Sequence, residues 1–398
     1  MKVLVLNCGS SSIKYKLFNT EDHSVEAQGG IEKIGLKGSF LKITLPSGEK
    51  VVLEKDIPEH TAGIDFILNT LVGEEYGCIK SLEEIGAVGH RIVHGGEKFN
   101  SSVLITDEVK DKIRECFDIA PLHNPANILG IRACQEVMPN VPNVAVFDTA
   151  FHQTMPAKAY LYGIPKEYYE KYGVRRYGFH GTSHSYVSQR VAELAGIDYK
   201  NSKIIVCHIG SGASVSAVVN GKSIDTSMGM TPLEGLLMGT RSGDLDPAIV
   251  EFLCNKENLS VSEVLEILNK KSGVFGISGV STDYRDLLAA EEEGNQDAHN
   301  AMEVMMYRII KYVGAYYTAM GGADAIVLTA GAGENNMKIR ARIVSGLSAL
   351  GVKLDDVAND VAGEERLVSA PDSKIPVWVV PTNEELKIAR ETAEVVGA

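Results

Sequence analysis

Short apolar runs alternate along the chain with longer segments of helical periodicity. The first run, at 3–6, leads into a polar stretch that contains glycine, after which Ile13, Tyr15 and Leu17 recur at every second position. This pattern predicts a β-hairpin with its turn at 7–12. A comparable pattern returns at 203–219. The two copies predict an internally duplicated fold, with chance similarity as the alternative, because strands joined by Gly-Ser turns are common.

Helix-start signals separate the predicted strands. The segment 124–138 begins with Asn-Pro, 182–196 begins with Thr-Ser, and 260–273 begins with the Ser-x-x-Glu spacing of a capping box. A longer helix is predicted to end at 321–322 and to feed a strand at 325–328. Its apolar stripe, expected in the core or at a subunit interface, consists of Met302, Met305, Ile309, Val313, Tyr316 and Met320.

The order of these elements predicts the fold class and the domain organisation. Strands that alternate with helices are typical of an α/β fold. A chain of 398 residues exceeds the size at which one hydrophobic core usually stops growing, so we expect two domains. We place the first at 1–150 and the second at 151–384. The last helix is predicted to begin at Thr382, and its residues 385–398 to complete the first domain.

Composition and charge narrow the functional classes. Hydrophobic residues make up 44% and charged residues 23% of the chain, as in a globular protein. The formal net charge of -13 speaks against a protein that coats nucleic acid or binds an anionic membrane. The six cysteines are widely separated and form no Cys-x-x-Cys pair, which favours free thiols in a reducing compartment. No leader and no apolar run of membrane-spanning length is evident, so we expect a cytoplasmic protein.

Three glycine-rich turns, at 7–12, 208–212 and 331–335, each follow a short predicted strand. Such turns can direct backbone N–H groups at phosphate oxygens, although a single one is often only a turn. Three at strand ends favour a phosphate ligand. The Walker signature is absent, because Ser216 stands where its first glycine should be, and Asn220-Gly221 is better interpreted as a tight hairpin turn.

Several isolated side chains are candidates for chemistry. Arg91 and Arg241 are flanked by glycines and suit bidentate binding of a carboxylate or phosphate, although either could be a surface residue. Asp148 ends the apolar run 144–147, where open α/β sheets place ligands. His180 and His184 have the spacing of a metal site but lack its glutamate. His180 could instead donate to a phosphoryl group or cap the chain locally.

Three long strings together resemble the acetate kinase family, and the likeness covers essentially the whole chain. They are LVLNCGSSSIK at 4–14, GFHGTSH at 178–184 and PTNEEL at 381–386. The resemblance implies the superfamily of acetate and sugar kinases, heat-shock proteins and actin, with two duplicated actin-like, ribonuclease H-like domains and a nucleotide cleft between them. It also implies that the second domain binds the nucleotide and that the protein is a homodimer.

Matched position by position, the resemblance also assigns roles. Asn7 and Glu384 would hold Mg²⁺, for which Mn²⁺ would substitute. The catalytic residues would be Asp148, Arg91, His180 and Arg241, with His123 in a supporting role. Arg91 would also bind the acid, whose methyl group would contact Val93, Leu122, Phe179 and Pro232. ATP or ADP would contact Lys14, His208, Ile209, Gly210, Ser211, Gly212, Asp283, Tyr284, Arg285, Gly331, Ala332, Gly333, Glu334 and Asn335. Ala332 departs from the isoleucine that the family often carries.

The implied reaction is reversible, direct transfer of the γ-phosphoryl group of ATP to acetate, which gives acetyl phosphate and ADP. A carboxylate has a reference pKa of about 4 and needs no strong base, so Asp148 is expected to organise the site. A kinase for propionate or butyrate is the nearest alternative. An actin-like or chaperone-like ATPase, in which nucleotide only switches conformation, would leave the two arginines unexplained. A sugar kinase would need a polar pocket, against which the four apolar residues argue.

Overall fold

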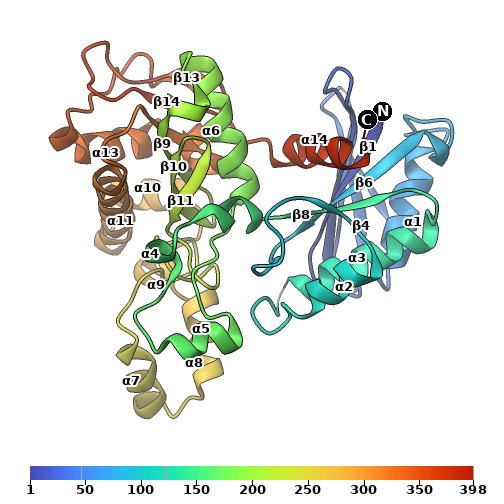
Figure 1. Cartoon of the computed structure of the whole chain (residues 1–398), viewed down its shortest axis with the longest axis horizontal. Coiled ribbons are helices and arrows are strands. Elements are labelled where there is room, and N and C mark those ends of the chain that lie inside the picture. The colour runs from blue at the N-terminus through green and yellow to red at the C-terminus, as the bar shows by residue number, and fades with distance from the viewer. Residues whose placement is uncertain (46, 122, 398) are drawn as a thin grey trace. The chain divides into compact units, whose positions relative to one another are not determined.

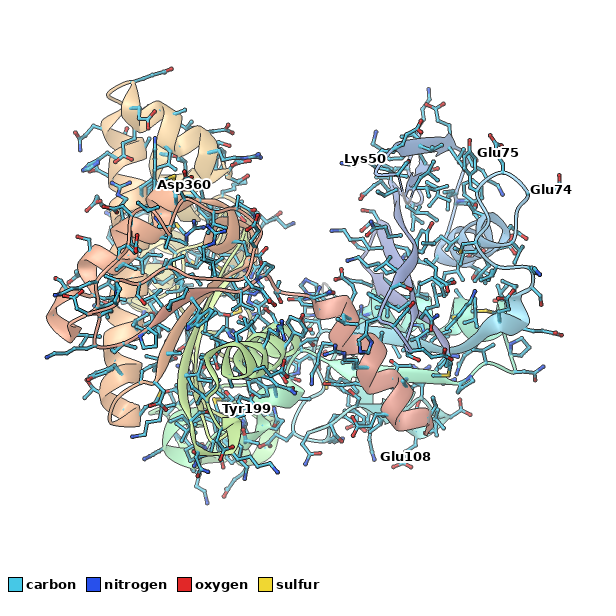
Figure 2. All side chains as sticks on the ribbon, turned by 90° about the horizontal axis from the view of Figure 1, so that it is seen from above. Lys50, Glu74, Glu75, Glu108, Tyr199 and Asp360 are labelled. Carbon is cyan, nitrogen blue, oxygen red and sulfur yellow. The ribbon has the colours of Figure 1, made fainter. Side chains whose placement is uncertain are left out.

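The computed structural model describes residues 1–45, 47–121 and 123–397. The chain divides into two compact units, Met1–Gln153 with Asn383–Ala398 and Thr154–Thr382, and each unit contains one β-sheet covered by helices (Figure 1). Exposed charged side chains such as Lys50, Glu75 and Glu108 point outward from the first unit, and Asp360 is exposed on the second (Figure 2).

The sheet of the first unit has the order β5-β4-β3-β2-β1-β6-β8-β7. Neighbours from β5 to β1 are antiparallel, β1, β6 and β8 are parallel, and β7 is antiparallel to β8. The strands are β1 Lys2–Cys8, β2 Ser12–Asn19, β3 Val25–Glu32, β4 Phe40–Thr44, β5 Lys50–Glu54, β6 Ile85–Ile92, β7 Val103–Leu104 and β8 Asn143–Phe147. The helices are α1 His60–Leu71, α2 Asp107–Arg114, α3 Asn124–Val137 and α14 Glu384–Val396.

Helices cover both faces of the parallel part of this sheet. Successive residues of a strand point to opposite faces. Val88 of β6 packs in the apolar core with Ile64 of α1 and Cys134 of α3. Its neighbour Gly89 points the other way, where a β-carbon would lie 2.4 Å from the Thr392 hydroxyl of α14. Glycine at position 89 therefore allows the C-terminal helix to pack closely against the sheet.

The sheet of the second unit has the order β11-β10-β9-β12-β14-β13. Its strands are β9 Lys203–Ile209, β10 Ala213–Val219, β11 Lys222–Thr226, β12 Ala325–Thr329, β13 Arg366–Leu367 and β14 Val377–Val379. Its helices are α4 Ala157–Tyr160, α5 Lys166–Tyr172, α6 Gly181–Ala195, α7 Ala248–Glu257, α8 Val261–Lys270, α9 Gly273–Ser278, α10 Tyr284–Glu292, α11 Gln296–Met320, α12 Ala330–Asn335 and α13 Met337–Gly346.

The two sheets share one topology. In each, an antiparallel hairpin is followed by two further parallel strands, and the last strand is antiparallel: β2-β1-β6-β8-β7 corresponds to β10-β9-β12-β14-β13. A third antiparallel strand flanks each hairpin, β3 in one sheet and β11 in the other. The α/β class and the internal duplication predicted from the sequence are confirmed.

Local sequence signals correctly predicted several elements. Ser260 and Glu263 form the expected reciprocal capping box at the start of α8. Asn220 and Gly221 form the predicted hairpin turn with φ values of 52° and 77°. The apolar stripe of α11 is buried within the chain. No helix in the described part of the chain is long and apolar enough to cross a membrane.

Two predictions of local structure, the cap of the last helix and the turn at 331–335, are wrong. The last helix is capped by Asn383, whose side chain accepts the Leu386 N–H at 3.1 Å, and not by Thr382. The hydroxyl of Thr382 is instead hydrogen-bonded to Ser183 at 2.8 Å. Residues 331–335 belong to the short helix α12 and are not a turn. This helix begins at Ala330, whose N–H donates to the Glu334 carboxylate at 2.7 Å and so closes the first helical turn.

Candidate active site

The first unit contains a pocket of about 430 Å³ that lies across one face of its sheet, beside α14. Four predicted site residues line it: Asn7 at the end of β1, Lys14 at the start of β2, Arg91 at the end of β6, and Glu384 in the first turn of α14. The carboxyl ends of the parallel strands β1 and β6 meet here, which is the usual position of ligands on an open α/β sheet. The sheet therefore brings together the residues predicted for the metal and the acid.

Arg91 and Asp148 form a bidentate pair beside this pocket. Nε and Nη2 of Arg91 donate to the Asp148 oxygens Oδ1 and Oδ2 at 3.0 and 2.7 Å. Asp148 directly follows β8, which pairs with β6, the strand that carries Arg91. The Asp148 residue is only 2% exposed. The negative charges of Asp148 and, to a lesser degree, Glu384 raise the pKa of the Arg91 guanidinium. Asp148 therefore fixes the position of a permanent cation.

The donors in the pocket suit a magnesium ion that retains most of its own ligands. Asn7 and Glu384 offer an amide and a carboxylate oxygen, and Mg²⁺ prefers one or two such ligands together with waters and substrate phosphates. Among the described residues there is no group of three or more His, Cys, Asp or Glu side chains that could hold a metal ion. A closed structural metal site is therefore not formed by the part of the chain that the structure describes.

A second pocket, of about 420 Å³, lies in the second unit and collects many of the predicted ATP contacts. It is lined by Gly210, Ser211, Thr282, Asp283, Tyr284, Arg285, Gly331, Ala332, Asn335 and Asn336. Its volume falls in the range of about 300–1,000 Å³ that small-molecule sites occupy. The Tyr284 hydroxyl donates to the Gly210 carbonyl at 2.9 Å and so links the β9–β10 turn to the start of α10. The small side chain at Ala332 leaves more space in this pocket than isoleucine would.

The other predicted ATP contacts lie elsewhere. Lys14 lines the pocket of the first unit. His208, Ile209, Gly212, Gly333 and Glu334 do not line the 420 Å³ pocket. Oε1 of Glu334 accepts the N–H groups of Ala330 and Thr382 at 2.7 and 2.9 Å, so this carboxylate fastens α12 to the strand end that leads into α14.

Three histidines cluster at the start of α6 and the end of β9. Nδ1 of His180 and Nε2 of His184 share hydrogen bonds with the Ser214 hydroxyl at 2.9 and 2.7 Å. The rings of His180 and His208 stack with their centroids 4.1 Å apart. Nδ1 of His208 is hydrogen-bonded to Ser183 at 2.8 Å. The ring of His180 is therefore held through Nδ1 by Ser214 of β10.

His180 and Arg241 converge above Gly212. A β-carbon built on Gly212 would lie 3.4 Å from Nε2 of His180 and 3.6 Å from Nη1 of Arg241. Both side chains therefore lie beside Gly212. Nη1 of Arg241 donates to the Pro232 carbonyl at 3.1 Å, and burial lowers the pKa of its guanidinium. Arg241 makes no ion pair with any described residue, unlike Arg91 or Arg176.

The predicted pocket for the methyl group is only partly described. Val93 and Phe179 are buried and Pro232 is half-buried, whereas Leu122 lies outside the described residues. His123 immediately precedes α3 and is half-buried. The role of these residues stays a prediction.

No motif in the sequence indicated Ser214 as a residue of the site. Ser214 and Ser216 are fully buried in a strand that is otherwise apolar. Buried hydroxyl groups must find hydrogen-bond partners, so two serines in an apolar strand were the available signal.

Comparison with known proteins gives a consistent result over the full length. The family model described as the Acetokinase family matches residues 2–390. Acetate kinase of Phocaeicola vulgatus is 63% identical and that of Bacteroides thetaiotaomicron 60% identical, each over 100% of both chains. The crystal structure of Porphyromonas gingivalis acetate kinase is 55% identical and superposes with a TM-score of 0.96 over 99% of each chain. A propionate kinase from Francisella tularensis is 42% identical, with a TM-score of 0.93 over 99% of each chain.

Proposed function

The chain belongs to the acetokinase family, and from this premise we propose that it transfers the γ-phosphoryl group of ATP to acetate, giving acetyl phosphate and ADP. The observation that carries the proposal is the environment of Arg241. This arginine makes no ion pair among the described residues and lies, like His180, beside Gly212. A cation held without a carboxylate partner is suited to an anionic ligand, and a phosphoryl group in transfer is such a ligand.

The proposed mechanism is direct in-line transfer. An acetate oxygen forms the new bond to the γ-phosphorus while the bond from phosphorus to the leaving oxygen of ADP breaks. Acetate is already ionised at neutral pH, since carboxylates have reference pKa values of about 4, so no general base is required. Both oxygens of Asp148 accept hydrogen bonds from Arg91, which supports an organising role for this carboxylate.

The main obstacle is the approach of two anions. Arg91 would bind the acetate carboxylate, and Arg241 and His180 would donate to the equatorial oxygens of the phosphoryl group. Groups held in position before the reaction stabilise developing charge with little reorganisation. The Arg91–Asp148 pair and the Ser214 hydrogen bonds support this assignment, because each fixes the orientation of one of these cationic or donor groups.

We propose Mg²⁺ as the metal and Asn7 and Glu384 as the residues that hold it, with Mn²⁺ as a substitute. When bound, the ion would neutralise charge on the ATP phosphates. The nucleotide itself would bind in the 420 Å³ pocket, which Gly210, Tyr284 and Ala332 help to line. A cytoplasmic location and a homodimer belong to the same proposal and rest on family membership and on the six free cysteines.

Phosphorylation of propionate is the second candidate, since a propionate kinase superposes closely on this chain. Both activities, and a switching ATPase, can be separated in one assay. We would measure Mg²⁺-dependent ADP release from ATP with acetate, propionate, butyrate, glycerol or no acceptor, and trap acyl phosphate with hydroxylamine. Release that requires acetate and yields hydroxamate supports the proposal. Equal release without an acceptor would instead identify an ATPase, and a higher kcat/KM with propionate would change the substrate.

A further inference from the structure

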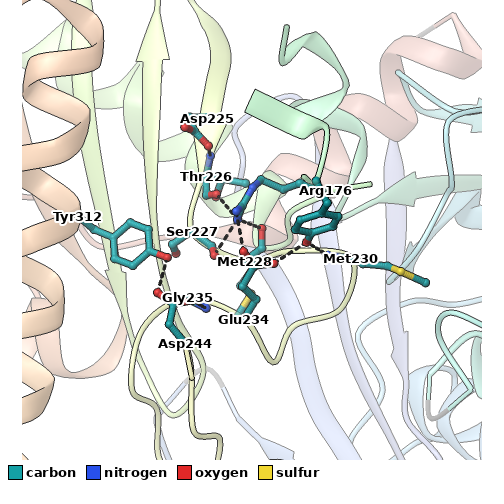
Figure 3. A network of polar contacts seen from close by, with 11 residues as sticks. Arg176, Asp225, Thr226, Ser227, Met228, Met230, Glu234, Gly235, Asp244 and Tyr312 are labelled. Atoms are coloured by element: carbon teal, nitrogen blue, oxygen red, sulfur yellow. Dashed lines mark hydrogen bonds and ion pairs between the residues drawn. The ribbon is translucent and has the colours of Figure 1, made fainter. Parts of the chain in front are cut away.

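Residues 227–244 form a long loop in the second unit that carries Arg241 and is fastened by side chains from outside it. Figure 3 shows two groups of contacts around this loop, one centred on Glu234 and one on Asp244. These are the two acidic residues of the loop. We define the Glu234 anchor as Arg176, Tyr162 and Glu234, and the Asp244 anchor as Gly235, Asp244 and Tyr312.

The Glu234 anchor fixes the first half of the loop. Nη1 of Arg176 donates to three successive carbonyl oxygens, those of Thr226, Ser227 and Met228, at 2.9, 3.0 and 3.0 Å. Nη2 of the same arginine donates to Oε1 of Glu234 at 2.6 Å (Figure 3). The Tyr162 hydroxyl donates to the other oxygen of Glu234 and accepts the Met230 N–H at 2.9 Å.

The Asp244 anchor closes the base of the second half. The Gly235 N–H donates to Oδ1 of Asp244 at 2.8 Å, and the Asp244 N–H donates to the Gly235 carbonyl at 2.9 Å. Oδ2 of Asp244 accepts from the Tyr312 hydroxyl of α11 at 2.7 Å (Figure 3). Gly243, at φ +64°, leaves no room for a side chain, since a β-carbon there would lie 2.3 Å from the Leu236 carbonyl oxygen. The backbone of 235–244 is therefore tightly closed and tied to α11.

The two anchors also determine the charge environment of Arg241. Both acidic residues of the loop already have partners: Arg176 and Tyr162 for Glu234, and Gly235 and Tyr312 for Asp244. Neither forms an ion pair with Arg241, whose guanidinium is hydrogen-bonded, among the described residues, only to the Pro232 carbonyl and the Met238 sulfur. This part-buried arginine has hydrogen-bond donors left for an anionic ligand.

We propose that Asp244, held by Tyr312, is a positioning residue that sets the place of Arg241 beside His180 without itself touching the substrate. The inference rests on the proposed function, in which Arg241 acts on the transferring phosphoryl group. Asp244 acts through the loop closure at Gly235 and through α11, and its bond to Tyr312 keeps its charge away from the guanidinium. Displacing a catalytic group by about 1 Å can lower a rate by about 100-fold, so a modest loosening of this closure is measurable.

The test uses Tyr312→Phe, Asp244→Ala and Arg241→Ala in the full-length enzyme, singly and as double variants with Arg241→Ala. The matched control is Tyr316→Phe, which removes a buried hydroxyl one turn away on α11, beside the Asp225 carboxylate and outside the loop. For Tyr312→Phe and Asp244→Ala we expect kcat to fall about 10-fold to 100-fold, with KM for ATP changed less than about 2-fold. Tyr316→Phe should retain the wild-type kcat.

A purely structural role predicts a different result. Tyr312→Phe would then lower the melting temperature and the fraction of folded enzyme, but kcat per folded molecule would be unchanged. If Asp244 acts through Arg241, adding Tyr312→Phe to Arg241→Ala should cost less than about 2-fold in kcat, because interacting residues are not additive. The proposal is wrong if Tyr312→Phe lowers kcat by the same factor in Arg241→Ala as in the wild-type enzyme. It is also wrong if folded Tyr312→Phe keeps the wild-type kcat.

If Asp244→Ala does not fold, the kcat of Tyr312→Phe decides alone. Failure of the proposed function is a separate result, since wild-type enzyme would then show no acetate-dependent ADP release.

Discussion

Arg91 donates hydrogen bonds to both carboxylate oxygens of Asp148, from Nε at 3.0 Å and from Nη2 at 2.7 Å. Its Nη1 makes no hydrogen bond with the described residues, and Arg91 lines a pocket that Asn7 and Glu384 also line. Asp148 therefore holds one edge of the Arg91 guanidinium in place, and the remaining N–H donors can bind a ligand. A carboxylate in such a pair orients a cation and does not need to accept a proton.

Arg91→Ala should lower kcat for acetate phosphorylation by about 100-fold to 1,000-fold, as expected when a preorganised donor to the transition state is removed. Asp148→Asn should cost less than Arg91→Ala, because the amide oxygen still accepts one bond from the guanidinium. Initial rates of hydroxamate formation at saturating ATP measure both effects. A residual rate in Arg91→Ala within about 3-fold of wild type is incompatible with the assigned role.

Arg190 provides the matched control. It also forms a bidentate pair, from Nε and Nη2 to the two oxygens of Glu365 at 2.7 and 2.8 Å, but this pair is exposed and does not line either pocket. Exposed ion pairs contribute only about 0–1 kcal/mol to stability. Arg190→Ala should therefore leave kcat and the melting temperature close to wild type.

Ser214→Ala should lower kcat about 10-fold while the protein stays folded. The Ser214 hydroxyl is the shared partner of His180 and His184, so its removal frees the His180 ring to rotate away from Gly212. Ser216→Ala is the control on the same strand and the same face, because Ser216 bonds to Ser223 and the Asp225 carbonyl and not to a histidine. Equal losses of kcat in both variants would argue against an orienting role for Ser214.

Local structure could be predicted from the sequence where the residues that determine it are close together in the chain. The Ser260–Glu263 capping box and the Asn220-Gly221 turn are local, and both were predicted correctly. Thr382 and Asn383 are both good capping residues, and the choice between them was settled by Ser183, 199 residues away, which bonds to Thr382. A glycine-rich segment at 331–335 suggested a turn because the helix-closing bond from Ala330 to Glu334 is invisible as a pattern.

The residues that hold the site in place could not be predicted when their partners are far away in the sequence. Arg91, Arg241 and His180 were found because they stand in distinctive strings, and the structure brings His180 and Arg241 together. Tyr312 and Asp244 are 68 residues apart, and His184 and Ser214 are 30 residues apart, so nothing in the local sequence connects them. The division into domains and the roles of the individual site residues stay predictions.

Glu384→Gln should raise the Mg²⁺ concentration needed for half-maximal activity about 10-fold or more, because a neutral amide is a weaker ligand for a hard divalent cation than a carboxylate. Titration of activity with MgCl₂ at fixed total ATP measures this change. The neighbouring Glu385 forms an ion pair with Lys16 at 3.3 Å and serves as the control. An unchanged Mg²⁺ requirement in Glu384→Gln, or the same shift in Glu385→Gln, would remove Glu384 from the metal site.

The last prediction concerns stability and pH. His90 is buried in β6, its Nε2–H donates to the Asn143 side-chain oxygen at 2.6 Å, and burial lowers its pKa to about 4. Below about pH 6.5 the unfolded chain binds a proton at this histidine, whereas the folded chain does not until the pH approaches 4. The contribution of neutral His90 to the free energy of unfolding is therefore fully present above about pH 6.5. It is lost progressively as the pH falls from about 6.5 to about 4.

Between pH 7.5 and pH 5.0 the contribution of His90 to this loss should be about 2 kcal/mol, since each pH step below the unfolded pKa of about 6.5 costs about 1.4 kcal/mol. His90→Gln keeps an N–H donor for Asn143 but cannot titrate, so it should be less stable than wild type at pH 7.5 yet lose less on acidification. Urea unfolding at the two pH values, without Mg²⁺, gives both quantities. His23→Gln is the control, because it replaces an exposed histidine and leaves His90 and Asn143 in place. If His90→Gln loses as much stability as wild type between the two pH values, the buried neutral histidine is not the group responsible.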